Sequence, residues 1–380
     1  MNVWSRRLRR FAIGLLGPVV AIGFALALSA VILKISGHDP WQAFRAMYDY
    51  GKTRASIISM LNRSIPYYIT GLAVAIGFKM NLFNIGVEGQ YRLAAVIAAW
   101  AGAAVKFPAP IHVLFIIAVA AAVGASLGGI TAILKVTRNV HEVITSIMLN
   151  TISTGLAAYL LAAHFAQKNK PGDLIIKTKE IPESGWFPSL NGLLSRIGIE
   201  LPIGSNLQGF IVVAVLLGVA YYFLVWRTRF GYDLRASGIN PFAAEASGVD
   251  PNRMVVTTLL LSGGVAGLAG LSQVLGFFHR YTIDFPTGLG FTGIGIALLG
   301  RNHPVGIAFG SLLFAFLERS AQVLDLEGVP KEIVVIMQGV MILSIVIAYE
   351  VVHRLVEIQE RKAVVEATHE APPGMEVAAA

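Results

Sequence analysis

The strongest constraint on the fold is a series of apolar segments, each about as long as a lipid bilayer is thick. A helix needs roughly 20 mostly apolar residues to cross the hydrocarbon core. Hydrophobic residues make up 55% of the sequence and charged residues only 14%, a balance that excludes a soluble domain. We expect an all-α polytopic membrane protein with about ten transmembrane helices, near residues 11–33, 55–78, 91–105, 111–134, 143–165, 207–226, 254–278, 288–300, 305–324 and 333–352.

The basic residues indicate how the chain is oriented. They lie in short turns at the ends of the apolar segments, where Lys and Arg are retained on the cytoplasmic side of a membrane. The net charge of +8 therefore reflects topology, and it does not indicate nucleic-acid binding. We expect both termini inside, a transmembrane domain over residues 1–352, a cytoplasmic loop at 227–253, an extracytoplasmic loop at 167–206 and a disordered cytoplasmic tail at 353–380.

Two glycine-rich segments do not fit ordinary spans. Lys79–Gln90 (KMNLFNIGVEGQ) is polar, and Gly288–Gly300 (GLGFTGIGIALLG) is only about half as long as a normal span. Broken or short helices in the two halves of a chain are typical of transport proteins, where they meet near the membrane midplane. The alternatives are a chance pattern in a glycine-rich chain and, for Lys79–Gln90, a plain cytoplasmic turn.

Polar side chains in or beside the apolar segments have alternative roles. A carboxylate near hydrocarbon is costly, so Glu88 is expected to contact a pathway or a partner. If it lies in a turn instead, it only caps the first turn of the next helix. For Asn150 we favour a hydrogen bond between helices over a contact with solute. Small residues at Gly124–Gly129 and Leu261–Gly264 predict close helix packing.

The polar loop 227–253 carries a very short helix with clear ends. Asn240 suits the N-cap, Pro241 the first helical position, and Gly248 the position just after the helix. Such a helix is shorter than the ~12–15 residues needed for even marginal stability in isolation. It must lie against another surface, which is either a soluble partner that drives movement or the protein's own body.

The sequence shows no sign of an enzyme. ATP-binding, zinc and nucleophile motifs are missing, and there is no cysteine. Leu261–Gly264 imitates part of the signature of ABC ATPases, but no Walker A motif accompanies it. We expect no catalytic residue and no metal site in this chain.

Four motifs resemble those of permease subunits from ABC importers for simple sugars and nucleosides. They are NLFNIGVEGQ (Asn81–Gln90), HEVITSIMLN (His141–Asn150), GYDLRASGINPFAAEASGV (Gly231–Val249) and GIGIALLGRNHPVG (Gly293–Gly306), and FNIGVEGQ is most similar to the nucleoside branch. The resemblance implies a permease in the bacterial cytoplasmic membrane that translocates nucleosides or related sugars. The alternative is an ATP-independent secondary carrier or channel for small polar solutes.

The resemblance also implies partners and site residues. The partners are a cytoplasmic ABC ATPase, a second permease for which a different chain is favoured, and an extracytoplasmic solute-binding protein. ATP and Mg²⁺ would bind the ATPase, and this chain would bind no cofactor. Asn240–Ser247 would be the coupling helix, with coupling residues Arg235, Gly238, Asn240, Pro241, Ala243, Ala244 and Gly248. Candidates for contact with the translocation pathway are Asn81, Asn84, Glu88, Gln90 and Asn150.

Overall fold

The computed structural model describes residues 20, 23–167, 175–326, 328–330, 332–340, 342–344, 347, 351 and 354. Their secondary structure is helical apart from isolated bridges, so the predicted all-α class is confirmed. The chain divides into two compact units. The core unit is Phe44–Gly328, and the two chain ends, Met1–Ala43 and Val329–Ala380, form the other.

The helices follow one another through short connections. They are α2 (Pro40–Gly51), α3 (Arg54–Phe78), α4 (Val87–Ala104), α5 (Ala109–Arg138), α6 (Glu142–Leu160), η1 (Leu161–Phe165), η2 (Glu183–Gly185), α7 (Asn191–Arg196), α8 (Phe210–Arg227), α9 (Arg229–Ile239), α10 (Pro241–Ala246), α11 (Pro251–Gly267), α12 (Leu271–Gly276), α13 (Leu289–Leu299) and α14 (Pro304–Leu326). The predicted outer loop thus contains η2 and α7, and residues 168–174 of it lie outside the described part.

Five stretches of described helix are long and apolar enough to cross a membrane. They correspond to α5, α6 with η1, α8, α11 with α12, and α14. Three shorter apolar helices cover Gly23–Ile35, Leu289–Leu299 and Glu332–Ser344. The ten-span count therefore stays a prediction. About half of the first predicted span, part of the tenth, and nearly all of the predicted tail lie outside the described residues.

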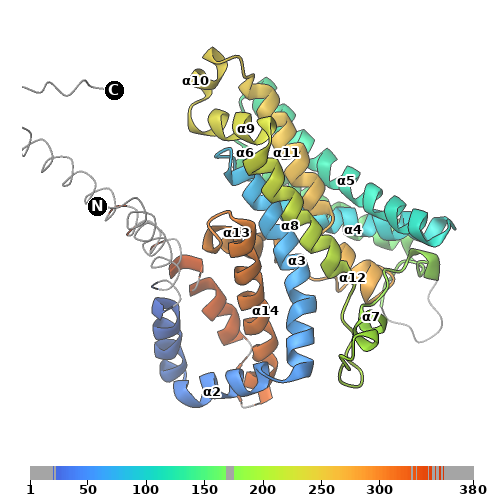
Figure 1. The fold of residues 1–380 in the computed structure, drawn as a ribbon, viewed down its shortest axis with the longest axis vertical. Coiled ribbons are helices and arrows are strands. Elements are labelled where there is room, and N and C mark those ends of the chain that lie inside the picture. The colour runs from blue at the N-terminus through green and yellow to red at the C-terminus, as the bar shows by residue number, and fades with distance from the viewer. Residues whose placement is uncertain are drawn as a thin grey trace, which may run out of the picture. The chain divides into compact units, whose positions relative to one another are not determined.

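The core unit is organised around α3. This helix packs against α8, α11, α13 and α14, as Figure 1 shows. Thr53 accepts a hydrogen bond from the Ser56 amide at its N-terminus, and the half from Ser64 to Gly77 is almost entirely buried. A helix that is apolar on all sides is expected in such an enclosed position.

Glycine lets α5 and α11 touch through their backbones. A Cβ added to Gly124 would lie 2.2 Å from the Gly263 carbonyl oxygen, and one added to Gly128 would lie 2.2 Å from that of Leu259. These distances leave no room for a side chain. The predicted close packing of both small-residue stretches is confirmed.

The structure differs from the prediction at three places. The helix expected to begin at Tyr91 begins at Val87, so Glu88 and Gln90 lie within its first turn. The helix expected over 254–278 is interrupted between α11 and α12, where Leu268 and Ala269 make tight bonds to carbonyls three residues earlier. The polar loop holds a second helix, α9, before α10.

Candidate functional site

The connecting segment Lys79–Gly86 folds back among the helices. Its Asn84 is 1% exposed and lies beside Ser262 of α11. The Asn84 amide nitrogen donates to the Ser262 hydroxyl at 2.7 Å and to the Gln90 side-chain oxygen at 3.0 Å. Gln90 donates back to Asn84 at 3.1 Å, and Ser262 donates to a carbonyl of α3. This closed arrangement buries the side chains of Asn84 and Gln90 among the helices.

Asn150 of α6 fixes the other side of the same segment. Its side-chain oxygen accepts from the Gly89 amide at 2.8 Å, and its nitrogen donates to the Ile85 carbonyl at 2.9 Å. A Cβ on Gly89 would lie 2.9 Å from the Asn150 backbone, so the two elements are in direct contact. The expected hydrogen bond between helices is present, and both polar atoms of the Asn150 side chain bond to backbone of the segment Ile85–Gly89.

Glu88 joins the two glycine-rich segments. Its carboxylate accepts from the amides of Gly288 at 2.8 Å and Gly290 at 2.9 Å, which begin α13, and the Tyr91 hydroxyl lies 3.0 Å away. Glu88 is only 5% exposed. Carboxylates are stabilised at helix N-termini, where free amides and the helix dipole favour negative charge. Glu88 therefore caps α13, a helix far away in the sequence, as well as lying in the first turn of α4.

The short helix α10 has the predicted ends. The Asn240 side chain accepts from the Ala243 amide at 3.1 Å, and Pro241 occupies the first helical position. Gly248 has a φ of +84°, the left-handed conformation that glycine adopts without strain. The helix of six residues is thus stopped at both ends by its own sequence.

The two faces of α10 differ. Ala243 is exposed, whereas Ala244 is 3% exposed and faces the protein, so of these two predicted coupling residues only Ala243 is accessible to a partner. The aromatic ring of Phe242 is 83% exposed, and Ile239 just before the helix is 84% exposed. This exposed apolar pair on a polar loop is a candidate contact surface for another protein. Arg235 instead turns back to the Gly231 carbonyl of α9.

The polar loop and the connecting segment touch each other. The Asn81 side chain donates to the Gly238 carbonyl of α9 at 2.7 Å. A Cβ on Gly238 would lie 2.7 Å from the Met80 backbone. Met80 and Leu234 also share a hydrophobic cluster with α11. A displacement of α9 and α10 would therefore be passed directly to the connecting segment.

Two parts of this arrangement were missing from the sequence analysis. The first is α9, whose start is signalled by Thr228: its hydroxyl accepts from the Gly231 amide at 3.1 Å as an N-cap. The second is the pairing of Glu88 with α13, which no local pattern reveals. Among the residues that the structure describes, no group of three His, Asp or Glu side chains could hold a metal ion.

Comparison with known proteins places these features in a family. The protein-family model described as "Branched-chain amino acid transport system / permease component" matches residues 56–346 of this chain. The guanosine ABC transporter permease protein NupP of Bacillus subtilis is 36% identical over 340 residues, which cover 89% of this chain and 94% of that protein. The glucose ABC transporter permease protein TsgB13 of Haloferax volcanii is 33% identical over 337 residues, covering 87% of this chain and 86% of that protein.

A third relative agrees. The nucleoside ABC transporter permease protein NupB of Lactococcus lactis is 29% identical over 338 residues, covering 87% of this chain and 90% of that protein. The matched region contains the connecting segment, the polar loop and α13. The chain is therefore a multi-pass membrane protein that belongs to the family of branched-chain amino acid transport system permease components.

Proposed function

We propose that this chain is the permease subunit of an ABC importer that moves nucleosides across the bacterial cytoplasmic membrane. The relatives named for guanosine and for nucleosides support this substrate class, and the relative named for glucose makes a sugar the second candidate. ATP and Mg²⁺ bind a separate ATPase subunit, and a solute-binding protein delivers the solute from outside. Family membership favours this over an ATP-independent carrier.

The observation that carries the proposal is the exposed, capped helix α10. Its fixed ends give it a defined shape, and Phe242 presents an aromatic surface at 83% exposure. Aromatic side chains are enriched at the centres of protein interfaces. In this proposal α10 lies on the cytoplasmic side, together with both chain termini, and Phe242 and Ala243 fit into a groove of the ATPase.

The contacts suggest how force reaches the pathway. ATP closes the ATPases and pulls α10, and the bond from Asn81 to Gly238 passes the movement to the connecting segment. Helix α4, which follows that segment directly, is tied to α13 through Glu88. Alternating access then follows from tilting of the helices around these broken segments.

We further propose that Asn84, Glu88, Gln90 and Asn150 border the pathway, whereas Asn81, the fifth predicted pathway residue, bonds to the Gly238 carbonyl of α9 and acts in coupling. In the conformation described, their polar groups bond to each other and to backbone. They therefore shape this region, and solute would contact them only after some of these bonds exchange. The solute-binding protein sets most of the specificity.

The second permease is proposed to be a different chain. Bacillus subtilis has two guanosine permease proteins similar to this one, at 36% and 24% identity. Lactococcus lactis likewise has two nucleoside permease proteins, at 29% and 24%. Two unequal relatives in one organism fit a pair made of two different subunits.

The test is to remove the aromatic ring from α10. In the assembled transporter, Phe242→Ala should weaken binding of the ATPase by about 2 kcal/mol, or about thirtyfold in the dissociation constant. This is the usual cost of truncating an interface residue that contributes most of the binding free energy. Uptake and stimulation of ATP hydrolysis should fall while the amount of permease in the membrane stays the same. Phe277→Ala, which truncates a ring that is 64% exposed after α12, is the control. Normal coupling in the Phe242 variant would refute the assignment of α10.

A further inference from the structure

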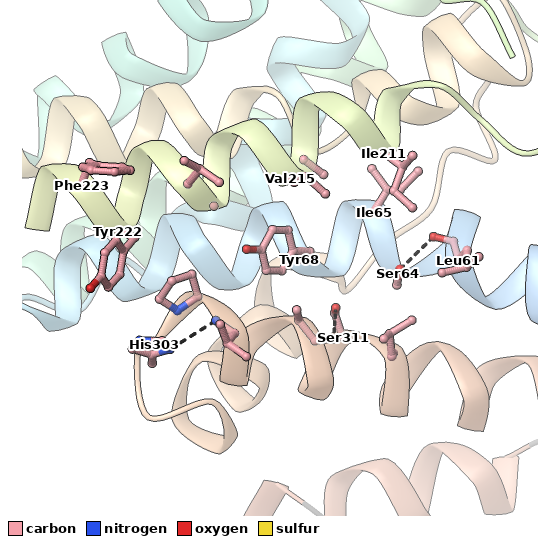
Figure 2. A pocket seen from close by; sticks show the side chains of 17 residues that line it. Leu61, Ser64, Ile65, Tyr68, Ile211, Val215, Tyr222, Phe223, His303 and Ser311 are labelled. Carbon is pink, nitrogen blue, oxygen red and sulfur yellow. Dashed lines mark hydrogen bonds between the residues drawn. The ribbon is translucent and has the colours of Figure 1, made fainter. Parts of the chain in front are cut away.

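A groove on the core unit has walls made almost entirely of carbon. It lies between α3, α8 and α14 and has a volume of about 620 Å³, within the range of ligand sites. Figure 2 shows Ile65, Val215 and Ile211 lining it. The hydroxyls of Ser64 and Ser311 donate to carbonyls of their own helices, at 2.8 Å each. Such walls offer a nucleoside or sugar few hydrogen-bonding partners, so the groove suits an apolar chain.

One end of the groove is aromatic and polar. Tyr222 and His303 line it there, at the end of α8 that leads into α9 and α10. Tyr222 stacks on Trp226 with ring centroids 5.5 Å apart, and the Trp226 and His303 rings are 5.4 Å apart. Aromatic rings of this kind gather at the level of lipid headgroups. The groove thus has an apolar length and an interfacial end.

A lysine lies beside that end. The Lys79 ammonium lies 5.0 Å from the centre of the Trp226 ring. Burial lowers the pKa of Lys79 from its ordinary value, and repulsion by Arg235 and Arg301 lowers it further. Burial also lowers the pKa of His303, with Lys79 contributing. No acidic group among the described residues contributes to either shift, so the local potential is positive and favours an anion.

We propose that this groove binds an anionic phospholipid, with one acyl chain between α3, α8 and α14 and the headgroup phosphate beside Lys79. Basic pockets between transmembrane helices at the cytoplasmic face are suited to anionic headgroups. The carbon walls and the cationic end together select such a molecule over a free anion, which gains nothing from the groove. The end of α8 there leads into α9, and the end of α3 leads to Met80, whose backbone contacts Gly238 of α9, so the lipid would brace the elements that carry α10.

The experiment uses the assembled transporter in nanodiscs of equal parts phosphatidylglycerol and phosphatidylcholine. After extraction in mild detergent, mass spectrometry counts the lipids retained. The unmodified protein should retain phosphatidylglycerol preferentially. Lys79→Gln should lower that preference about fivefold, as expected for one basic residue near a membrane surface. Arg138→Gln, at the exposed end of α5, should leave it unchanged.

A neighbouring pair of substitutions tests the groove itself. Val215 lines it and is 57% exposed, whereas Leu216 does not line it and is 61% exposed. Val215→Trp should fill the groove and reduce retention of lipid, and Leu216→Trp should not. Each variant is first shown to melt at the temperature of the unmodified protein in detergent without lipid, and a variant that melts earlier is replaced by Val219→Trp, also in the groove.

Several results would overturn the proposal. One is equal retention of the two lipids, and another is a preference that neither Lys79→Gln nor the groove-filling variant alters. If millimolar inorganic phosphate alone displaced the retained lipid, the site would bind any small anion and would not select a phospholipid. Loss of the second permease from the Val215→Trp complex, with lipid retention unchanged, would show an interface between subunits.

Discussion

Replacing Glu88 by Gln tests whether the start of α4 and the start of α13 move as one unit. The two amides that begin α13 bond to different oxygens of the carboxylate, and glutamine keeps an oxygen for only one of them. The other amide then faces an NH₂ group in a buried site. An orphaned buried amide costs about 1–3 kcal/mol, and loss of charge assistance removes about another 1 kcal/mol. We therefore expect the junction to lose about 2–4 kcal/mol, at least a thirtyfold shift toward its separated state.

Two assays separate stability from coupling. Thermal melting of the purified variant reports the loss at the junction, and uptake with ATP hydrolysis in proteoliposomes reports coupling. We expect uptake to fall at least tenfold (about 1.4 kcal/mol) while the ATPases still hydrolyse ATP. The control is Glu318→Gln, which changes a partly buried carboxylate of α14 that accepts from the Tyr67 hydroxyl of α3 at 2.9 Å and pairs with Arg63. This control should lower stability and leave the ratio of solute moved to ATP hydrolysed unchanged.

The reasoning would be refuted by either of two results. If Glu88→Gln melts and transports as the unmodified protein does, the carboxylate does not hold α13. If it melts earlier but couples normally, the junction is a structural contact only, and force reaches the pathway by another route.

Three further predictions address other contacts. Asn81→Gly keeps the left-handed backbone but removes the 2.7 Å bond to α9, so uptake should fall while stability changes by about 1 kcal/mol or less. Gly263→Leu should force α5 and α11 apart and lower the melting temperature, by an overpacking cost of about 1–3 kcal/mol or more, whereas Gly155→Leu, with open space around it, should not. Burial lowers the pKa of His279, so stability should fall as the pH drops below the unfolded value of about 6.5; His279→Phe, which keeps a ring on Trp186, should lose less stability between about pH 7.5 and about pH 5.5. Unchanged uptake in the Asn81 variant, equal melting of the two glycine variants, or an equal loss of stability with and without the His279 imidazole would contradict the respective prediction.

Local features of the fold could be read from the sequence. Apolar runs predicted the bounds of α3, α5, α8 and α14 to within a few residues. These helices are apolar on most sides, so each appears in the sequence as an uninterrupted run of apolar residues. The ends of α10 were equally clear, since Asn240, Pro241 and Gly248 each act on the backbone next to them. These predictions depended only on neighbours in the chain.

The features that could not be predicted from the sequence depend on tertiary contacts. Helix α9 contains Gly231 and Gly238, which weaken a helix in isolation, yet both glycines are needed because other backbone lies where a Cβ would be. The inward face of Ala244 could not be read from a two-turn helix. The role of Glu88 required knowing that α13 begins beside α4, which is a property of the folded bundle.

The clamp at Glu88 also dictates an order of assembly during synthesis. The first amide that it accepts from belongs to a residue 200 positions later in the chain. At about 5–20 residues per second, a ribosome takes roughly 10–40 seconds to reach that residue. Through that interval the nascent N-terminal half carries a carboxylate without its final partners, so α4 is best kept in contact with the insertion machinery or with water until α13 emerges. Maturation of this protein should therefore be sensitive to changes in translation speed between the two halves.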